Sequence, residues 1–284
     1  MAGLYRSAVR EAEVRSWCSD RLARWELPHT RHEIDTSCGQ THVVSVGAGE
    51  GICIFLPGTN FNAASSTVGL GALASRCRVY AADLPGQPGL SSAIRPAHEH
   101  RGYAAWVTDL IAWVRRRHPD ERILLTGHSR GAAVALSADP DDVDGLALLA
   151  PAGLTRVRPS IEMLRSTVPW LVRRNDAGAA RLLAYMSGPG HAVSGDLVEW
   201  MTLVARACRT TGAPGPLPAA AVTRWKGHDV RVALGEHDVF FPVTRLRGAC
   251  RSRLGRDPVV VPGAGHLVVD EEPSLVSEIV ASLR

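Results

Sequence analysis

The chain has 284 residues, of which 45% are hydrophobic and 21% are charged. These proportions argue against disorder, and the length suffices for one large α/β domain or two small ones. The formal net charge is +4, and Lys226 is the one lysine among 32 basic residues. Because the arginines are scattered along the whole chain, the composition does not indicate a nucleic-acid-binding surface.

Cysteine usage and charge placement bear on the cellular compartment. The six cysteines include no C-x-x-C pair, so the sequence indicates neither a zinc site nor a thioredoxin-like centre, and we expect free thiols. The first twenty residues are interspersed with charges and show no signal peptide. Residues 51–75 carry no charge, but prolines, glycines and asparagines interrupt them and exclude a membrane-spanning helix. We therefore expect a cytoplasmic protein with no membrane and no nucleic-acid partner.

Strand and helix patterns alternate along most of the chain. A run of apolar residues at 52–56 is typical of a strand that is buried on both faces. Further strands are predicted at 31–37, 41–46, 78–83, 122–126, 145–149, 230–234 and 258–261. Helices are predicted at 4–25, 63–75, 103–114, 132–138 and 273–283. The alternation predicts a mostly parallel sheet with helices on both faces.

One region interrupts this alternation. Residues 154–226 have helical patterning at 161–173, 177–186 and 196–209, followed by a proline-rich hinge. We interpret the region as a helical insertion and not as a separate domain. Residues 1–153 and 227–284 would then form the surrounding core.

The strongest chemical motif is Gly127-x-Ser129-x-Gly131, between a predicted strand and a predicted helix. A sharp, strained turn needs glycines at the two flanking positions, and it lifts the serine hydroxyl off the end of the sheet. The same turn directs the next backbone N–H toward developing negative charge. Its place between strand and helix makes the motif a specific indication of a serine nucleophile.

A serine hydroxyl needs a base, and the base needs a carboxylate that fixes its tautomer. His266 follows the last predicted strand, and Asp238 follows the strand before it. His237 is an alternative base, and Glu236 is an alternative acid. Alternation after the strand disfavours Glu236, because neighbouring side chains point in different directions.

With Ser129, Asp238 and His266 in this order, the sequence resembles the α/β-hydrolase family over nearly its whole length. The resemblance implies an eight-stranded, mostly parallel sheet with a helical lid inserted after the sixth strand, where residues 154–226 lie. It implies that these three residues are the catalytic triad, with His266 as the base. It implies no metal and no organic cofactor.

The resemblance also implies an oxyanion hole made of two backbone N–H groups. One belongs to Arg130, directly after the nucleophile, and the other to Thr59, after the third strand. Pro57 departs from the histidine that many family members carry at its place. The loop and the lid should supply the substrate contacts, and the candidates are Asn60, Trp170, Met186, Trp200 and Met201, with Trp225 as a further large apolar residue.

These observations predict acyl-enzyme chemistry on a small-molecule acyl substrate. The leading interpretation is a carboxylesterase-like or thioesterase-like hydrolase of esters, lactones or thioesters. The alternatives are an acyltransferase or cyclase of a biosynthetic pathway, and a non-catalytic ligand-binding protein. Whether the chain is a monomer or a homodimer is left open.

The net charge is unevenly placed. The predicted lid has ten basic and four acidic residues, whereas the rest of the chain has 22 basic and 24 acidic residues. The positive excess therefore lies in the segment that should cover the active site. This placement leads to the hypothesis that the acyl substrate is anionic or carrier-bound, and the alternative is an ordinary solvated lid surface.

Overall fold

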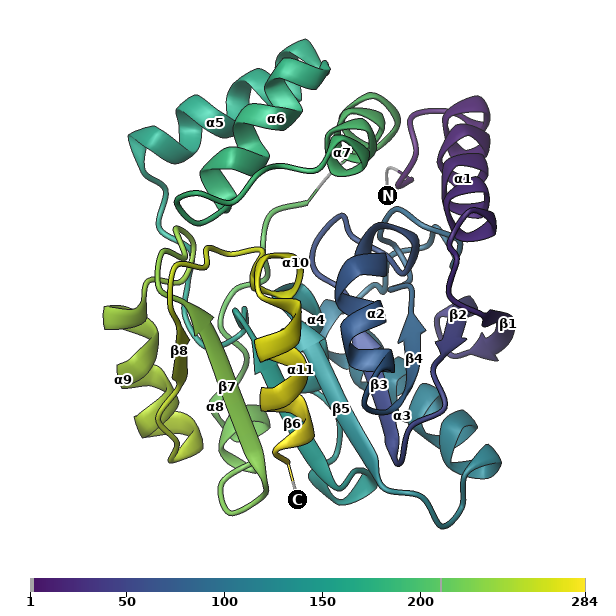
Figure 1. Cartoon of the computed structure of the whole chain (residues 1–284), viewed down its shortest axis with the longest axis vertical. Helices are drawn as coiled ribbons and strands as arrows, with labels where there is room; N and C mark the ends of the chain where they lie inside the picture. The colour runs from purple at the N-terminus through teal and green to yellow at the C-terminus, as the bar shows by residue number, and fades with distance from the viewer. Residues whose placement is uncertain (1–2, 210, 284) are drawn as a thin grey trace.

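An eight-stranded sheet forms the centre of the computed structural model, which describes residues 3–209 and 211–283 (Figure 1). The strand order is β1-β2-β4-β3-β5-β6-β7-β8. Strand β2 runs antiparallel to β1 and β4, and the other neighbouring pairs are parallel, as the alternating pattern predicts. The strands are β1 (His29–Thr36), β2 (Gly39–Val46), β3 (Ile52–Leu56), β4 (Arg78–Ala82), β5 (Ile123–His128), β6 (Gly145–Leu149), β7 (Val230–Gly235) and β8 (Val259–Val261).

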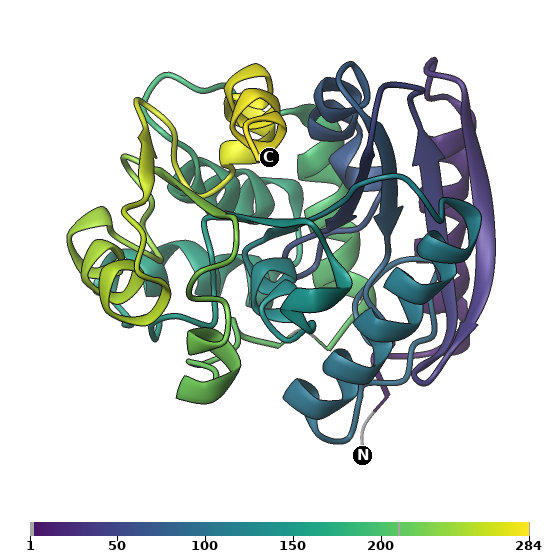
Figure 2. The same cartoon turned by 90° about the horizontal axis from the view of Figure 1, so that it is seen from below.

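Helices cover both faces of this sheet (Figure 2). One face carries α2 (Thr67–Ala74), preceded by the 3-10 helix η1 (Ala64–Ser66), together with α10 (Val268–Glu271) and α11 (Pro273–Ala281). The other face carries α3 (Glu99–Arg117), α4 (Arg130–Ala135), α8 (Ala219–Thr223) and α9 (Val243–Leu254). A second 3-10 helix, η2 (Pro140–Asp142), precedes β6.

The uninterrupted apolar sequence of β3 is explained by the position of this strand in the sheet. Ile52, Ile54 and Leu56 belong to the hydrophobic cluster beneath α3 and α4, whereas Cys53 and Phe55 belong to the cluster beneath α2 and α11. Successive side chains of a strand point to opposite faces, and here helices cover both faces. Every residue of β3 is therefore buried.

The segment 154–226 is helical, as its patterning predicts. It contains α5 (Ile161–Arg173), α6 (Asp176–Met186), α7 (Gly195–Ala207) and the short α8. Helices α5, α6 and α7 lie above the carboxyl ends of the strands, whereas α8 packs against α9 beside the sheet (Figure 1). The division of the chain into a core and a lid remains a prediction.

The N-terminal segment packs against this insertion. Helix α1 (Ala8–Ala23) contacts α7, and Tyr5 forms an isolated antiparallel bridge with Cys208. Trp17 of α1 lies against Trp200 of α7 with 4.7 Å between the ring centroids. The first helix thus supports the insertion from the side.

Several elements depart from the prediction, including the short helices α8 and α10, which were not predicted, and α1, which begins four residues later than predicted. Helix α9 was not predicted, because only Leu246, Cys250 and Leu254 are buried among its many arginines and form a narrow apolar stripe. Helix α3 begins four residues earlier than predicted, since its first turn is polar. Among residues 3–209 and 211–283, no helix has both the length and the apolar character needed to cross a bilayer.

Candidate active site

Ser129 lies in a sharp turn between β5 and α4. Its backbone has φ 51° and ψ −110°, a conformation that non-glycine residues rarely adopt and that marks strain. A Cβ atom at Gly131 would overlap the carbonyl oxygen of Leu56, and one at Gly127 would overlap the backbone of Gly131. The two glycines therefore allow the backbone segments to approach closely enough to form the turn.

The imidazole of His266 reaches this serine from the loop after β8. Its Nε2 lies 3.0 Å from Ser129 Oγ, and its Nδ1 lies 2.8 Å from Asp238 Oδ2. The backbone of the loop is held at the histidine and at the residue before it, because the His266 N–H donates to the carbonyl of Met186 at 2.7 Å and the Gly265 N–H donates to Glu271 Oε2 at 2.6 Å. These contacts fix the ring between the serine and the carboxylate.

The carboxylate of Asp238 is buried and ionised. Burial raises the pKa of this carboxyl, but the His266 ring and the backbone N–H groups of Phe241 and Phe240 more than offset that effect and hold the pKa below its ordinary value. The two amides donate to Oδ1 at 2.9 and 2.8 Å. An ionised carboxylate only accepts hydrogen bonds, so His266 Nδ1 carries the hydrogen and the neutral ring accepts from the Ser129 hydroxyl through Nε2.

Three rings surround the imidazole. Phe240 packs edge-on against His266 with centroids 4.8 Å apart, and Phe241 lies at 5.7 Å. His128 lies at 5.3 Å, and its Nε2 is 2.9 Å from the carbonyl oxygen of His266. Since a carbonyl only accepts, Nε2 of His128 donates this hydrogen bond.

The predicted oxyanion-hole residues lie on either side of the serine. Arg130 is the first residue of α4, and Thr59 follows β3 in a loop whose Gly58 approaches His128 and Ser129 closely. In the described part of the chain, neither the Thr59 nor the Arg130 backbone N–H donates a hydrogen bond. Both amides are thus available to an oxygen atom bound beside Ser129.

A mostly apolar cavity of about 370 Å³ opens onto Ser129 and His266. Four of the five predicted substrate-contact residues line it, namely Asn60, Trp170, Met186 and Met201. The remaining lining residues are Gly58, Thr59, Phe61, His128, Val157, Pro159, Met163, Thr167, Leu182, Gly212, Ala213, Phe240 and Phe241.

Trp200, the fifth candidate, does not line this cavity. Its side chain is fully buried against Trp17, and its Nε1 donates to the carbonyl of Asn60 at 2.8 Å. The indole therefore supports the loop that carries Thr59 and Asn60, instead of facing a substrate. Trp225 is buried on the far side of the sheet, where it donates to the carbonyl of Leu136.

The two alternative triad residues point elsewhere. Glu236 is half-exposed and accepts from the Gly263 N–H at 3.0 Å. His237 is also half-exposed, with Nε2 3.7 Å from Glu236 Oε2. In the described structure neither contacts Ser129 or His266.

Several lining residues lie outside the sequence-based prediction. Phe240 and Phe241 wall the cavity while their amides hold Asp238. They lie two and three residues after an aspartate, which is the spacing of an Asx turn. This spacing in the sequence could have indicated that their amides bind Asp238. Gly212 and Ala213 reach the cavity from the chain after α7, and no local pattern indicates this.

Comparisons with known proteins define the class to which this protein belongs. A family model described as the alpha/beta hydrolase family matches residues 53–279. The chain belongs to this family, which confirms the resemblance drawn from the sequence motifs. A search of curated proteins found no match.

Several solved structures with the same fold come from Bacillus subtilis. A putative hydrolase of this bacterium superposes with a TM-score of 0.80 at 18% identity, covering 97% of this chain and 99% of that chain. Its carboxylesterase CesB gives 0.77 at 20% identity, covering 97% and 98%. Its naproxen esterase gives 0.76 at 21% identity, covering 96% of each chain. At sequence identities of 18–21%, the similarity to these structures shows that the fold is shared.

Proposed function

We propose that this protein is a serine hydrolase that cleaves a carboxylic ester, lactone or thioester through an acyl-enzyme on Ser129. The observation that carries the proposal is the continuous hydrogen-bonded line from Asp238 through His266 to Ser129, buried beside an apolar cavity. This is the arrangement in which an alcohol becomes a nucleophile at neutral pH.

The reaction would proceed in two halves. Ser129 Oγ attacks the substrate carbonyl carbon while its proton moves to His266 Nε2, and the ionised Asp238 stabilises the imidazolium. The Thr59 and Arg130 N–H groups stabilise the negative oxygen of the tetrahedral intermediate. Its collapse breaks the bond to the leaving group, which takes the proton from His266. Water then attacks the acyl-enzyme, with His266 as the base, and releases the acid.

The cavity supports an apolar acyl group. Its walls are mostly methionine, leucine, phenylalanine, tryptophan and other apolar residues, and its polar lining residues are Ser129, His266, His128, Thr59, Asn60 and Thr167. Such a lining binds an acyl chain or ring by burial and leaves bond cleavage to the triad. Two structures with the same fold are named as esterases, which favours an ester over other acyl compounds.

We further propose that the natural substrate is anionic or carrier-bound. Arg158 is exposed and stands between Val157 and Pro159, which both line the cavity. This exposed arginine and the positive excess of the insertion support a substrate with a phosphate or carboxylate group outside the cavity.

A panel of p-nitrophenyl esters, lactones and acyl-thioesters tests the reaction class. Wild-type protein should hydrolyse at least one member, and Ser129→Ala should abolish turnover. Asp238→Asn should lower kcat by on the order of 10³- to 10⁴-fold, because the amide cannot stabilise the correct imidazole tautomer.

Glu236→Gln is the matched control for the acid and should keep kcat within about twofold. Equal losses in both acid variants would contradict the assignment of Asp238. A product that appears only when an acceptor alcohol or amine is added would identify an acyltransferase, and no turnover of any member would contradict the hydrolase.

A further inference from the structure

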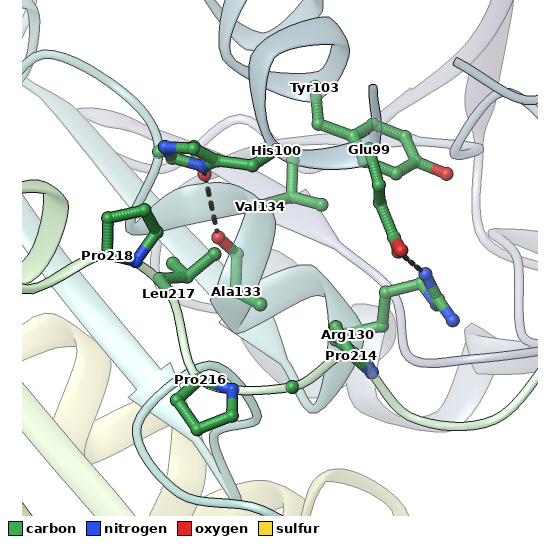
Figure 3. Close-up of a pocket in the computed structure, with 12 residues that line it drawn as sticks. Glu99, His100, Tyr103, Arg130, Ala133, Val134, Pro214, Pro216, Leu217 and Pro218 are labelled. Atoms are coloured by element: carbon green, nitrogen blue, oxygen red, sulfur yellow. Dashed lines mark hydrogen bonds and ion pairs between the residues drawn. The ribbon is translucent and has the colours of Figure 1, made fainter. Parts of the chain in front are cut away.

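The Arg130 side chain is buried, although its backbone directly follows the nucleophile Ser129. Only 3% of the residue's surface is exposed, and Arg130 lines a second cavity of about 170 Å³, where its guanidinium lies against Glu99 (Figure 3). This second cavity lies beside Glu99, His100 and Tyr103 of α3. Arg130 is therefore not placed to touch an acyl group bound at Ser129.

Four hydrogen-bonding contacts surround this guanidinium. Nε donates to Thr59 Oγ1 at 3.2 Å, and Nη1 pairs with the carboxylate of Glu99 at the start of α3. Nη2 donates to Thr211 Oγ1 at 3.1 Å and to the carbonyl of Gly212 at 2.6 Å. One side chain thus joins the nucleophile turn, the loop after β3, helix α3 and the chain that follows α7.

We name residues 211–218 the strap, because they run between the two cavities. Gly212 and Ala213 line the catalytic cavity, whereas Pro214, Pro216 and their neighbours up to residue 218 line the second one (Figure 3). Arg130 holds the strap at the end that faces the active site.

The guanidinium remains charged at neutral pH. Burial and the nearby Arg95 lower its pKa to about 10. A buried charge is stable only when it is paired and its donors are satisfied, and Glu99, Thr59 and the strap satisfy them. Loosening any one of these partners disturbs the others.

We propose that the Arg130 side chain is a positioning residue for the oxyanion hole, which holds the Thr59 loop and the strap against the nucleophile turn. The inference rests on the proposed function, because it concerns the two amides that would bind the oxyanion. Donors held in place before the reaction stabilise the transition state most, and small misplacements are costly. Losing the side chain should therefore lower kcat more than it changes KM.

Arg253 provides a matched control. It donates to the carbonyls of Gly153 and Leu154 at 3.3 and 2.9 Å and to the carbonyl of Leu217 at 2.7 Å. It therefore ties the other end of the strap to the core but touches neither Thr59 nor the nucleophile turn. Its removal should weaken the fold without disturbing the two amides.

The test compares Arg130→Ala, Arg130→Lys, Thr59→Val and Arg253→Ala with the wild type. Readouts are the rate of Ser129 labelling by a fluorophosphonate, kcat and KM for the best ester, and Tm. Arg130→Ala should lower kcat and the labelling rate by about 10- to 100-fold, less than removal of an oxyanion donor itself. KM should stay within about threefold.

The other variants separate positioning from folding. Arg130→Lys should recover part of the lost rate, and Thr59→Val should lose less than Arg130→Ala because it removes one contact. Arg253→Ala should lower Tm while kcat stays within about twofold. Guanidinium chloride at non-denaturing concentration should partly restore Arg130→Ala, whereas equal sodium chloride should not.

Three outcomes would overturn the inference. The first is a wild-type labelling rate in Arg130→Ala, and the second is an equal loss of kcat in Arg253→Ala. The third applies if Arg130→Ala does not fold. In that case, an unchanged kcat in both Arg130→Lys and Thr59→Val would overturn the inference. A wild type that the probe does not label would instead overturn the proposed function and the inference with it.

Discussion

His128 shows how burial sets a protonation state next to the nucleophile. Its ring is buried, and its Nε2 donates to the backbone carbonyl of His266. Burial and, to a smaller extent, the neighbouring His266 together lower the pKa of His128 to about 4. The neutral form therefore holds the loop that carries His266.

This shift predicts a contribution to stability that depends on pH. The pKa in the folded state lies below the ordinary value of 6.5, so protonation favours the unfolded chain. The stabilisation is complete above pH about 6.5 and is lost as the pH falls toward 4, by up to about 3 kcal/mol.

The variant His128→Gln keeps a donor for the His266 carbonyl but cannot be protonated. Its Tm should fall less than that of the wild type between pH 7 and pH 4, as followed by circular dichroism. Parallel Tm profiles for the two proteins would show that His128 does not contribute in this way.

At the scale of elements, the nucleophile turn depends on the close approach of β3 to α4. A Cβ atom at Gly131 would overlap the carbonyl of Leu56 and lie close to that of Pro57. Gly248 of α9 is a contrasting helical glycine, exposed and with open space where a Cβ would stand.

Alanine should therefore have opposite effects at these two glycines. Gly131→Ala should destabilise the fold by about 3 kcal/mol or more, because backbone atoms must shift. Gly248→Ala should stabilise α9 by about 0.5–1 kcal/mol, since alanine loses less entropy in a helix. Urea unfolding measures both, and a Gly131→Ala protein of wild-type stability would contradict the packing described for the turn.

Local signals account for the parts of the site that were predictable. Ser129 lies in a short motif between a strand and a helix, and Asp238 and His266 each follow a strand. In a parallel sheet such strand ends meet at one edge, so their proximity follows from the alternation. The long amphipathic pattern of α3 and the apolar run of β3 were equally readable.

Contacts between segments that are distant in the sequence leave no local pattern and could not be predicted. Trp200 packs on Trp17, from the first helix, and so supports the Asn60 loop instead of the substrate. Arg130 finds its partners in Glu99 and Gly212, which no spacing in the sequence relates to it. Helix α9 was missed because arginines outnumber its buried residues.

At the scale of the whole molecule, the positive excess lies on the insertion above the strand ends. Arg158 adjoins the catalytic cavity, whereas Arg116 lies in the last turn of α3, before the start of β5. Salt screens attraction between exposed charges, so an electrostatic preference should depend on ionic strength.

A pair of acyl donors tests this preference. For an acyl-coenzyme A, kcat/KM should fall on the order of fivefold between 20 and 300 mM sodium chloride, while a neutral thioester with the same acyl group should change little. Arg158→Gln should lower kcat/KM for the anionic donor alone, and Arg116→Gln should have no effect. Equal salt dependence for both donors would contradict the hypothesis of an anionic substrate.

Covalent capture tests most directly whether Ser129 is the nucleophile. Wild-type protein is incubated with a fluorophosphonate, and intact-mass spectrometry and peptide mapping locate the adduct. We predict one adduct per chain on Ser129, formed quickly in the wild type, slowly in His266→Ala and not at all in Ser129→Ala. No adduct, or an adduct on a different residue that survives Ser129→Ala, would contradict the account.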